Sequence, residues 1–217
     1  MSLYEKTVYP QLAEPISADE LVLDFTPTEE EIEFSTRSAR QPASRLTLLV
    51  LLKLFQKLHR FPNTDEVPAA VVDHVRIQLR LGAAILFEHD DPVQRARQRH
   101  VIREYTGFAA WSKEPRHVAA VAGYQAALVM GRAADITNAI IGALTNAHFE
   151  LPAFSILERT ARHARALVHR KVCGNVFARL TAEERQALDR LLVIQSINAE
   201  RQFRGSSDCL SGRRVST

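Results

Sequence analysis

The sequence predicts an all-α fold, and three observations support this prediction. Apolar residues recur at steps of three and four positions along most of the chain, which places them on one face of a helix. No segment of any length alternates between apolar and polar residues, as a half-buried strand would. The chain has only 8 glycines in 217 residues, and 46% of its residues are hydrophobic. We therefore expect one or two helical domains.

The first helix is predicted to begin after Thr28 and to reach about Ser38. The Thr28 hydroxyl can cap this helix, and Glu31, three residues later, completes a capping box. The acidic first turn also suits the positive N-terminal end of the helix dipole. Residues 1–24, which contain two prolines, are expected to form an irregular arm.

The next predicted helix, from Pro42 to about Arg60, is the most apolar of the chain. Its apolar residues occupy more than one face: Leu48, Leu49, Val50, Leu51, Leu52, Leu54, Phe55 and Leu58. Because this apolar surface is so wide, we expect the helix to be buried on two sides and central to its domain.

Two more helices complete the first predicted domain, residues 1–110. One begins at residues 64–65 and is expected to end at Gly82. The other begins with an aspartate pair before Pro92, is rich in arginine and stops at Gly107. This basic helix has too few apolar residues to be stable alone, so it must pack on the domain.

Residues 108–116 are the predicted boundary to a second domain, residues 111–197. An alanine-rich helix over residues 117–130 and a helix over residues 134–147 come first. Ser155 is predicted to cap the next helix, with Glu158 completing its capping box. The buried stripe of that helix should consist of Leu157, Ala161, Ala164, Val168 and Val172.

A last helix is predicted over residues 183–192, with a capping box at Thr181 and Glu184. Residues 198–217 are polar, lack an apolar period and are expected to be a disordered tail.

The segment from Asp135 to Arg170 resembles a helix-turn-helix, whose second helix lies in the DNA major groove. The connection of about seven residues is longer than the usual three or four. Arginine suits this role because its guanidinium can meet a guanine edge or a phosphate with two hydrogen bonds. An ordinary helix pair with a charged outer face is the alternative. The candidate DNA-binding residues on the outer face are Ser155, Arg159, Thr160, Arg162, His163 and Arg165.

The basic helix of the first domain supplies a second candidate group, Arg95, Arg99 and Arg103. Its basic residues spread around the helix, so contact with the phosphate backbone is favoured over base reading. A solvated helix face is the alternative. The net charge is only +3, but arginines cluster in this helix and after residue 158, whereas residues 19–33 carry no Lys or Arg. This distribution favours a protein that presents chosen faces to phosphate.

Other classes of function find little support in the sequence. The acidic clusters are typical of helix starts, and the sequence contains no Gly-rich phosphate loop. It also places no Ser, His and Asp together as a catalytic set. We therefore expect no catalytic residue and no enzyme activity. Two isolated cysteines and scattered histidines predict neither a metal site nor a disulfide framework, and no cofactor is expected. No apolar run reaches the ~18 residues of a membrane span, and a signal-peptide pattern is lacking, so the expected location is the cytoplasm.

Several short motifs, in this order and at these spacings, resemble the N-terminal region of the replicative transposases of the Tn-three family. They are Phe25-Thr26-Pro27, Arg45-Leu46, Arg60-Phe61-Pro62, Val67-Pro68-Ala69-Ala70-Val71, Arg103-Glu104-Tyr105-Thr106-Gly107-Phe108, Leu151-Pro152-Ala153-Phe154-Ser155-Ile156-Leu157-Glu158-Arg159 and Leu180-Thr181-Ala182-Glu183-Glu184-Arg185.

The resemblance implies two helical DNA-binding modules that bind double-stranded DNA at the inverted repeats of transposon ends. It also implies a chain without catalysis of its own, since the family's Asp-Asp-Glu domain lies further along a full-length protein. After Leu192 the sequence departs from the family pattern. One codon choice for residues 205–210, shifted by a frame, encodes the basic segment that the family has there, so a frameshift is expected. The runner-up is a helical protein-interaction or oligomerisation module, and whether the chain is a homodimer stays open.

Overall fold

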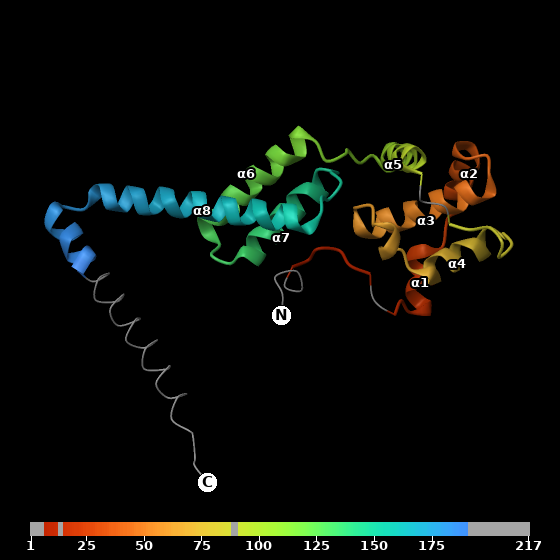
Figure 1. Cartoon of the computed structure of the whole chain (residues 1–217), viewed down its shortest axis with the longest axis horizontal. Helices are drawn as coiled ribbons and strands as arrows, with labels where there is room; N and C mark the ends of the chain where they lie inside the picture. Colours follow the sequence, from red (N-terminus) through yellow and green to blue (C-terminus); the bar gives the residue numbers. More distant parts are fainter. Residues whose placement is uncertain (1–6, 13–14, 88–90, 191–217) are drawn as a thin grey trace, which may run out of the picture. The chain divides into compact units, whose positions relative to one another are not determined.

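The computed structural model describes residues 7–12, 15–87 and 91–190 (Figure 1). The predicted all-α class is confirmed, because these ranges contain helices, a single isolated bridge between Ala109 and Phe149, and no strand. The chain divides into two compact units, residues 1–166 and 167–217. The division falls inside one helix, α8 (Phe154–Arg179).

The first helix, α1 (Ala18–Phe25), corrects the prediction of an irregular arm for this stretch. Ser17 caps it, because the Ser17 hydroxyl accepts a hydrogen bond from the Glu20 N–H at 3.2 Å and the Glu20 carboxylate accepts one from the Ser17 N–H. The sequence contains the signal for this capping box, because Glu20 follows Ser17 by three residues. Phe25, at the end of the helix, is buried in the first hydrophobic cluster.

The next two helices follow their predictions. Helix α2 (Glu29–Ser38) begins with the expected capping box of Thr28 and Glu31. Helix α3 (Pro42–Leu58) is buried along its whole middle, from Leu46 to Phe55.

Helix α4 (Ala69–Gln78) starts later than predicted, because a 3-10 turn, Thr64–Glu66, occupies the expected start. It also ends before Gly82. Helix α5 (Pro92–Thr106) begins and ends as predicted, with the Asp91 carboxylate capping its start and Gly107 in the left-handed conformation (φ 72°) at its end.

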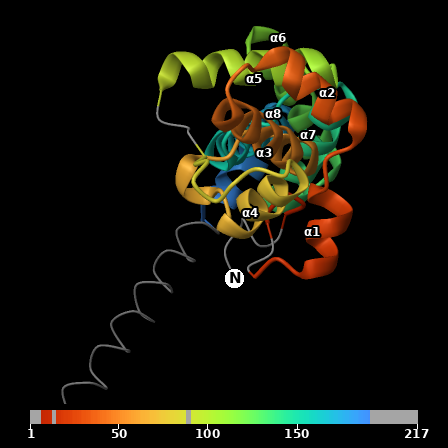
Figure 2. The ribbon, with the colours of Figure 1, turned by 90° about the vertical axis from the view of Figure 1, so that its right-hand side faces the viewer.

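Helix α3 lies at the centre of the first hydrophobic cluster, with α1, α2, α4 and α5 around it (Figure 2). Leu46, Leu49, Leu51, Leu54 and Phe55 are completely buried. A helix that is apolar on every side needs partners on every side. The four surrounding helices meet this requirement.

A buried ion pair joins α2 to α3. Lys53, 7% exposed, and Glu31, 4% exposed, approach with 3.3 Å between Nζ and Oε2. The Glu31 carboxylate also accepts hydrogen bonds from the Gln56 side chain at 2.7 Å and from the Thr28 N–H at 2.8 Å. A buried charge is stable only with such a full set of partners.

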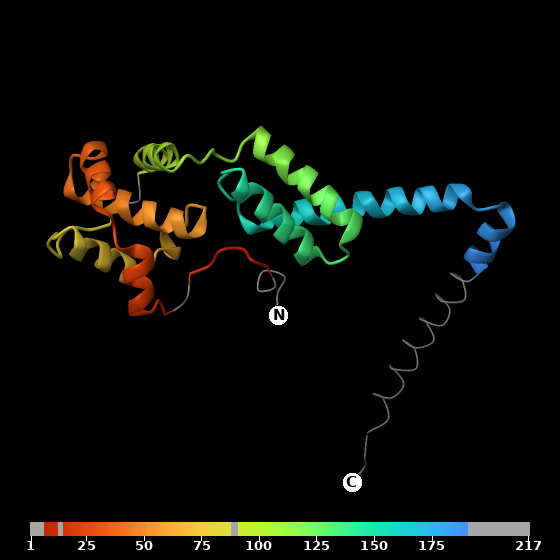
Figure 3. The same cartoon turned by 180° about the vertical axis from the view of Figure 1, so that it is seen from behind.

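A second hydrophobic cluster forms where α6 (Lys113–Val129), α7 (Ala133–Asn146) and the first half of α8 meet (Figure 3). Gly123 of α6 allows the close approach, because an added Cβ would lie 3.0 Å from Ile140 Cδ1 and 3.4 Å from Ala164 Cβ. The predicted stripe of α8 is correct through Val168 and wrong at Val172, which is 51% exposed.

A short joint connects the two clusters. Ala109 donates to the carbonyl of His148 and accepts from Glu150, both at 2.9 Å, and the Leu151 N–H donates to the carbonyl of His59 at 2.8 Å. The Phe108 ring stacks on the His59 imidazole, with 5.3 Å between centroids, and contacts His148 as well.

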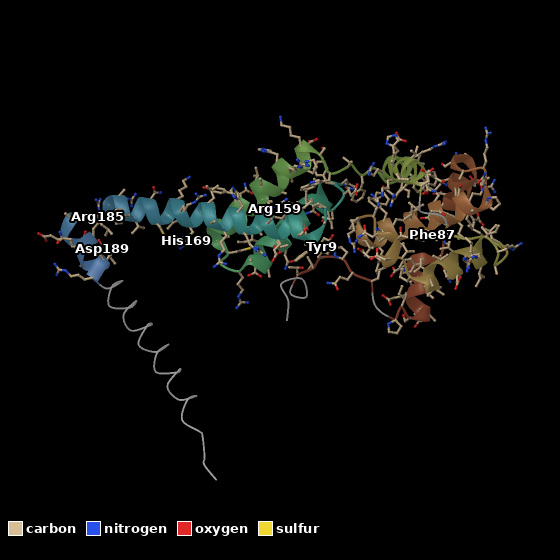
Figure 4. All side chains as sticks on the ribbon, in the orientation of Figure 1. Tyr9, Phe87, Arg159, His169, Arg185 and Asp189 are labelled. Atoms are coloured by element: carbon tan, nitrogen blue, oxygen red, sulfur yellow. The ribbon has the colours of Figure 1, made fainter. Side chains whose placement is uncertain are left out.

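The stretch before α1 also bridges both clusters. Tyr9 is buried in the second cluster, where its hydroxyl donates to the carbonyl of Pro152 at 3.0 Å and its ring meets Phe154 edge-on (Figure 4). The guanidinium of Arg60, at the end of α3, lies 5.5 Å from the Tyr9 ring centre. The described residues before α1, 7–12 and 15–17, therefore form no helix, as predicted, and Tyr9 among them is firmly packed.

The second unit is described through residue 190. It contains α8 from Leu167 onward and a helical stretch over residues 182–190. The predicted capping box of Thr181 and Glu184 is confirmed, and the hydrogen bonds from Thr181 lower the pKa of the Glu184 carboxyl. The expected disordered tail, 198–217, lies outside the described residues.

Replacing Lys53 should be costly because it leaves the Glu31 carboxylate buried with one partner fewer. We expect Lys53→Met to lower the free energy of unfolding by about 3–5 kcal/mol, measured by urea denaturation. Glu31→Gln in the same chain should restore most of this loss, since the uncompensated charge is then gone. Lys57→Met is the matched control, since its pair with Asp24 is about one-third exposed, and it should cost less than about 1 kcal/mol.

The joint should make stability depend on pH through His59. Burial lowers the pKa of His59 below its ordinary value of 6.5, and the nearby His148 lowers it further. The fold therefore favours neutral His59, and this contribution is complete above pH 6.5 and is lost as the pH falls towards the lowered value. We expect the melting temperature to drop below pH 6.5 more in the wild type than in His59→Asn, which tolerates the left-handed backbone (φ 51°). Equal slopes would contradict this role.

Candidate nucleic-acid interface

The first half of α8 presents the predicted basic face. Leu157, Ala161 and Ala164 are buried, so the remaining positions of these turns point away from the cluster. Arg159, Arg162, His163 and Arg165 are exposed. Figure 4 shows Arg159 on the part of α8 that lies beside α6. The sequence thus predicted this face correctly.

Three of the predicted residues line a cleft between α8 and the start of α6. The cleft has a volume of about 520 Å³, and its lining is Trp111, Arg116, Ala120, Ile156, Arg159, Thr160 and His163. Arg116, Arg159 and His163 make no hydrogen bond or ion pair with any residue that the structure describes. Two arginines, a histidine and an aromatic ring therefore line one accessible cleft, and such a combination can bind a nucleotide.

Two predicted residues of α8 already have partners within the helix, and a third is exposed outside the cleft. Arg162 forms an ion pair with Glu158, one turn earlier in the helix. The Thr160 hydroxyl donates to the carbonyl of Ile156 at 2.8 Å. Arg165 is exposed but does not line the cleft.

Ser155 is not the cap that the sequence predicted. Helix α8 begins one residue earlier, at Phe154, so Ser155 lies within the first helical turn and is exposed. Glu158 pairs with Arg162 and does not complete a capping box. A contact of the Ser155 hydroxyl with DNA stays a prediction.

The predicted residues of α5 face different surroundings. Arg103 forms an ion pair with Glu150 at 2.9 Å, with both side chains largely buried. Arg99 lies over the Phe61 ring at 5.2 Å, and burial lowers the pKa of its guanidinium, which Glu150 partly offsets. Arg95 is half-buried. Arg99 and Arg103 thus lie at the joint between the clusters, and neither lines the α8 cleft.

Residues that sequence reasoning did not select also gather at accessible sites. Trp111 and Arg116 complete the α8 cleft, and Arg97 of α5 lines a separate cavity. One signal for that cavity was present in the sequence. Gln94, Arg97, Gln98 and Val101 recur at steps of three and four, so they share one polar-edged face of α5.

Among the described residues, no group of three or more His, Cys, Asp or Glu side chains is placed to hold a metal ion. None of the helices in the described part of the chain is both long and apolar enough to cross a membrane.

The helices and this cleft define an all-α protein with an aromatic and basic cleft on its surface. A family model, the domain of unknown function DUF4158, matches residues 1–164, so the chain belongs to the DUF4158 family. The match covers the first compact unit except for its last two residues. No curated protein matches the sequence significantly.

Because Arg103 is engaged at the joint, its replacement should affect stability. We expect Arg103→Gln to lower the free energy of unfolding by about 1–3 kcal/mol, since Glu150 then loses its partly buried partner. Glu150→Gln should cost a similar amount, and the double variant should cost less than the sum in a double-mutant cycle. Additive effects would show that the two side chains do not interact in solution.

Proposed function

We propose that this chain binds double-stranded DNA at the terminal inverted repeats of a transposon, as the non-catalytic N-terminal part of a Tn-three family transposase. The α8 cleft is the observation that carries the proposal, because it combines unpaired Arg116, Arg159 and His163 with Trp111. The family match adds support, since DUF4158 domains are common in transposases of the Tn-three family.

Helix α8 is the proposed recognition element. It follows α7 after a connection of seven residues, 147–153, which matches the helix order of a helix-turn-helix with a longer turn. Arg159 faces outward without a competing carboxylate, so its guanidinium is free for a base edge or a phosphate. Arg116 would reach the adjacent phosphate backbone from α6.

The single tryptophan of the chain offers a direct readout. Trp111 lines the α8 cleft, and no other tryptophan contributes to the fluorescence. Binding of duplex DNA to this cleft should change the Trp111 emission in step with binding measured by fluorescence anisotropy. A bound complex with unchanged emission would place the DNA elsewhere.

Arg159→Ala should weaken binding to two duplexes unequally. The loss of affinity should be larger for a duplex that carries the terminal inverted repeat of the transposon next to the gene than for a duplex of random sequence. A bidentate base contact contributes about 1–3 kcal/mol of discrimination, so the preference should fall roughly 5- to 150-fold. Arg116→Ala should weaken both duplexes alike, as a phosphate contact does. Arg170→Ala is the matched control, because Arg170 is an exposed arginine of α8 outside the cleft. Equal losses for Arg159→Ala on both duplexes would contradict base recognition.

A helical protein-interaction module is the second candidate function. Val172, Val176 and Phe177, in the described part of the second unit, are about half exposed, and apolar surface of this kind favours association. Salt dependence separates the two candidates. Only DNA binding predicts an affinity that falls steeply with salt, whereas association through these residues would appear as dimers in sedimentation and be lost in Val176→Asp.

A further inference from the structure

A second cavity lies on the first hydrophobic cluster, away from the α8 cleft, and shares no lining residue with it. It measures about 710 Å³ and is enclosed by the end of α2, the turn before α3 and one face of α5. It is partly open to solvent. Its size exceeds that of a single phosphate and accommodates a nucleotide unit.

Three arginines converge on this cavity from separate elements. Arg37 belongs to α2, Arg40 to the turn and Arg97 to α5, and all three are exposed. None of them makes a hydrogen bond or an ion pair within the part of the chain that the structure describes. Among the described residues, the one carboxylate in the lining is that of Asp91, which caps α5 by accepting from the Val93 N–H at 2.9 Å. The described part of the lining therefore carries an excess of positive charge.

The start of α3 adds backbone donors. Gln41 provides no side-chain cap, and Pro42 at the first position has no N–H. The N–H groups of Ala43 and Ser44 therefore lack the acceptor that a capping side chain usually supplies. Gln41 and Ser44 both line the cavity. A helix start of this kind attracts anions, since the donors and the helix dipole act together.

Gln98 is an independent sign that the cavity is built for a ligand. Its side chain lines the cavity, the residue is only 7% exposed, and its Oε1 is buried with no hydrogen-bond partner among the described residues. A buried polar atom without a partner is costly and is retained where a ligand or a function needs it. The carbonyl oxygen cannot bind an anion, but the NH₂ group of the same amide also has no hydrogen-bond partner among the described residues and can donate to one.

We propose that this cavity binds a phosphate group of a DNA strand, with Arg37, Arg40, Arg97, the start of α3 and the Gln98 amide as its ligands. The proposal rests on the proposed function, because it gives the bound DNA a second contact surface besides the α8 cleft. Contacts here neutralise backbone charge and carry no sequence information.

The charge contribution is tested with Arg40→Gln/Arg97→Gln. The affinity for any duplex should fall about 10- to 60-fold near 0.1 M salt, and the slope of log affinity against log salt should decrease by about 2. Arg80→Gln/Arg132→Gln removes the same charge from exposed arginines outside both cavities and should change much less. Equal changes in the two double variants would overturn the proposal.

Gln98→Leu separates a ligand role from a structural one. Removal of the unpartnered buried amide should leave the melting temperature unchanged or raise it, while the affinity for DNA falls. A structural amide would show the reverse, with a lower melting temperature and unchanged affinity, and that result would contradict the proposal.

A titration with inorganic pyrophosphate keeps this proposal distinct from the proposed function. It should shift the amide resonances of Ala43 and Ser44, and Arg40→Gln/Arg97→Gln should abolish these shifts. If the wild type binds duplex DNA through the α8 cleft while the cavity variants behave like their controls, only the cavity proposal falls. If the wild type binds no DNA, the proposed function falls. In that case the pyrophosphate titration alone tests the cavity. Shifts of the Ala43 and Ser44 resonances would show that the cavity binds a phosphate that does not come from DNA, and the absence of shifts would overturn the proposed phosphate site.

Discussion

The burial of α3 on all sides is the constraint from which the rest of the first cluster follows. Every residue from Leu46 to Phe55 is buried, so each neighbouring helix must give its apolar face to α3 and turn its polar face outward. Lys53 adds a further constraint on how α2 packs against α3, because its buried ammonium needs the Glu31 carboxylate within bonding distance. The ion pair therefore fixes the register of α2 against α3, and with it the position of Arg37 at the end of α2.

The joint at Phe108 connects the first hydrophobic cluster to the second. Its backbone hydrogen bonds and the stacked rings tie the end of α3 and the segment after α5 to the connection before α8. Arg103 and Glu150 close the same joint with an ion pair. Side chains of α5 that meet the joint serve packing, whereas those on its other face, such as Arg97, line an accessible cavity.

Local signals in the sequence predicted much of this structure. The capping boxes at Thr28 and Thr181, the stop at Gly107 and the apolar width of α3 each depend on residues within a few positions. The errors have equally local causes. Two prolines concealed the Ser17 box of α1, and the Ser155 pattern resembled a cap although the helix starts before it. The pairing of Arg103 with Glu150 spans 47 residues, so no local pattern could reveal it.

Long-range pairing also means that arginine content alone cannot identify which arginines are available to bind phosphate. An arginine already paired with a carboxylate or packed on a ring loses that contact when it binds phosphate, so its net contribution is small. Arg99 and Arg103 are of this kind, and the lowered pKa of Arg99 reflects its desolvation. Within the described ranges, Arg97, Arg116 and Arg159 have no such contact to lose. Tertiary packing therefore decides which arginines stay unpaired in the described part of the chain, and Arg97, Arg116 and Arg159 line the two cavities.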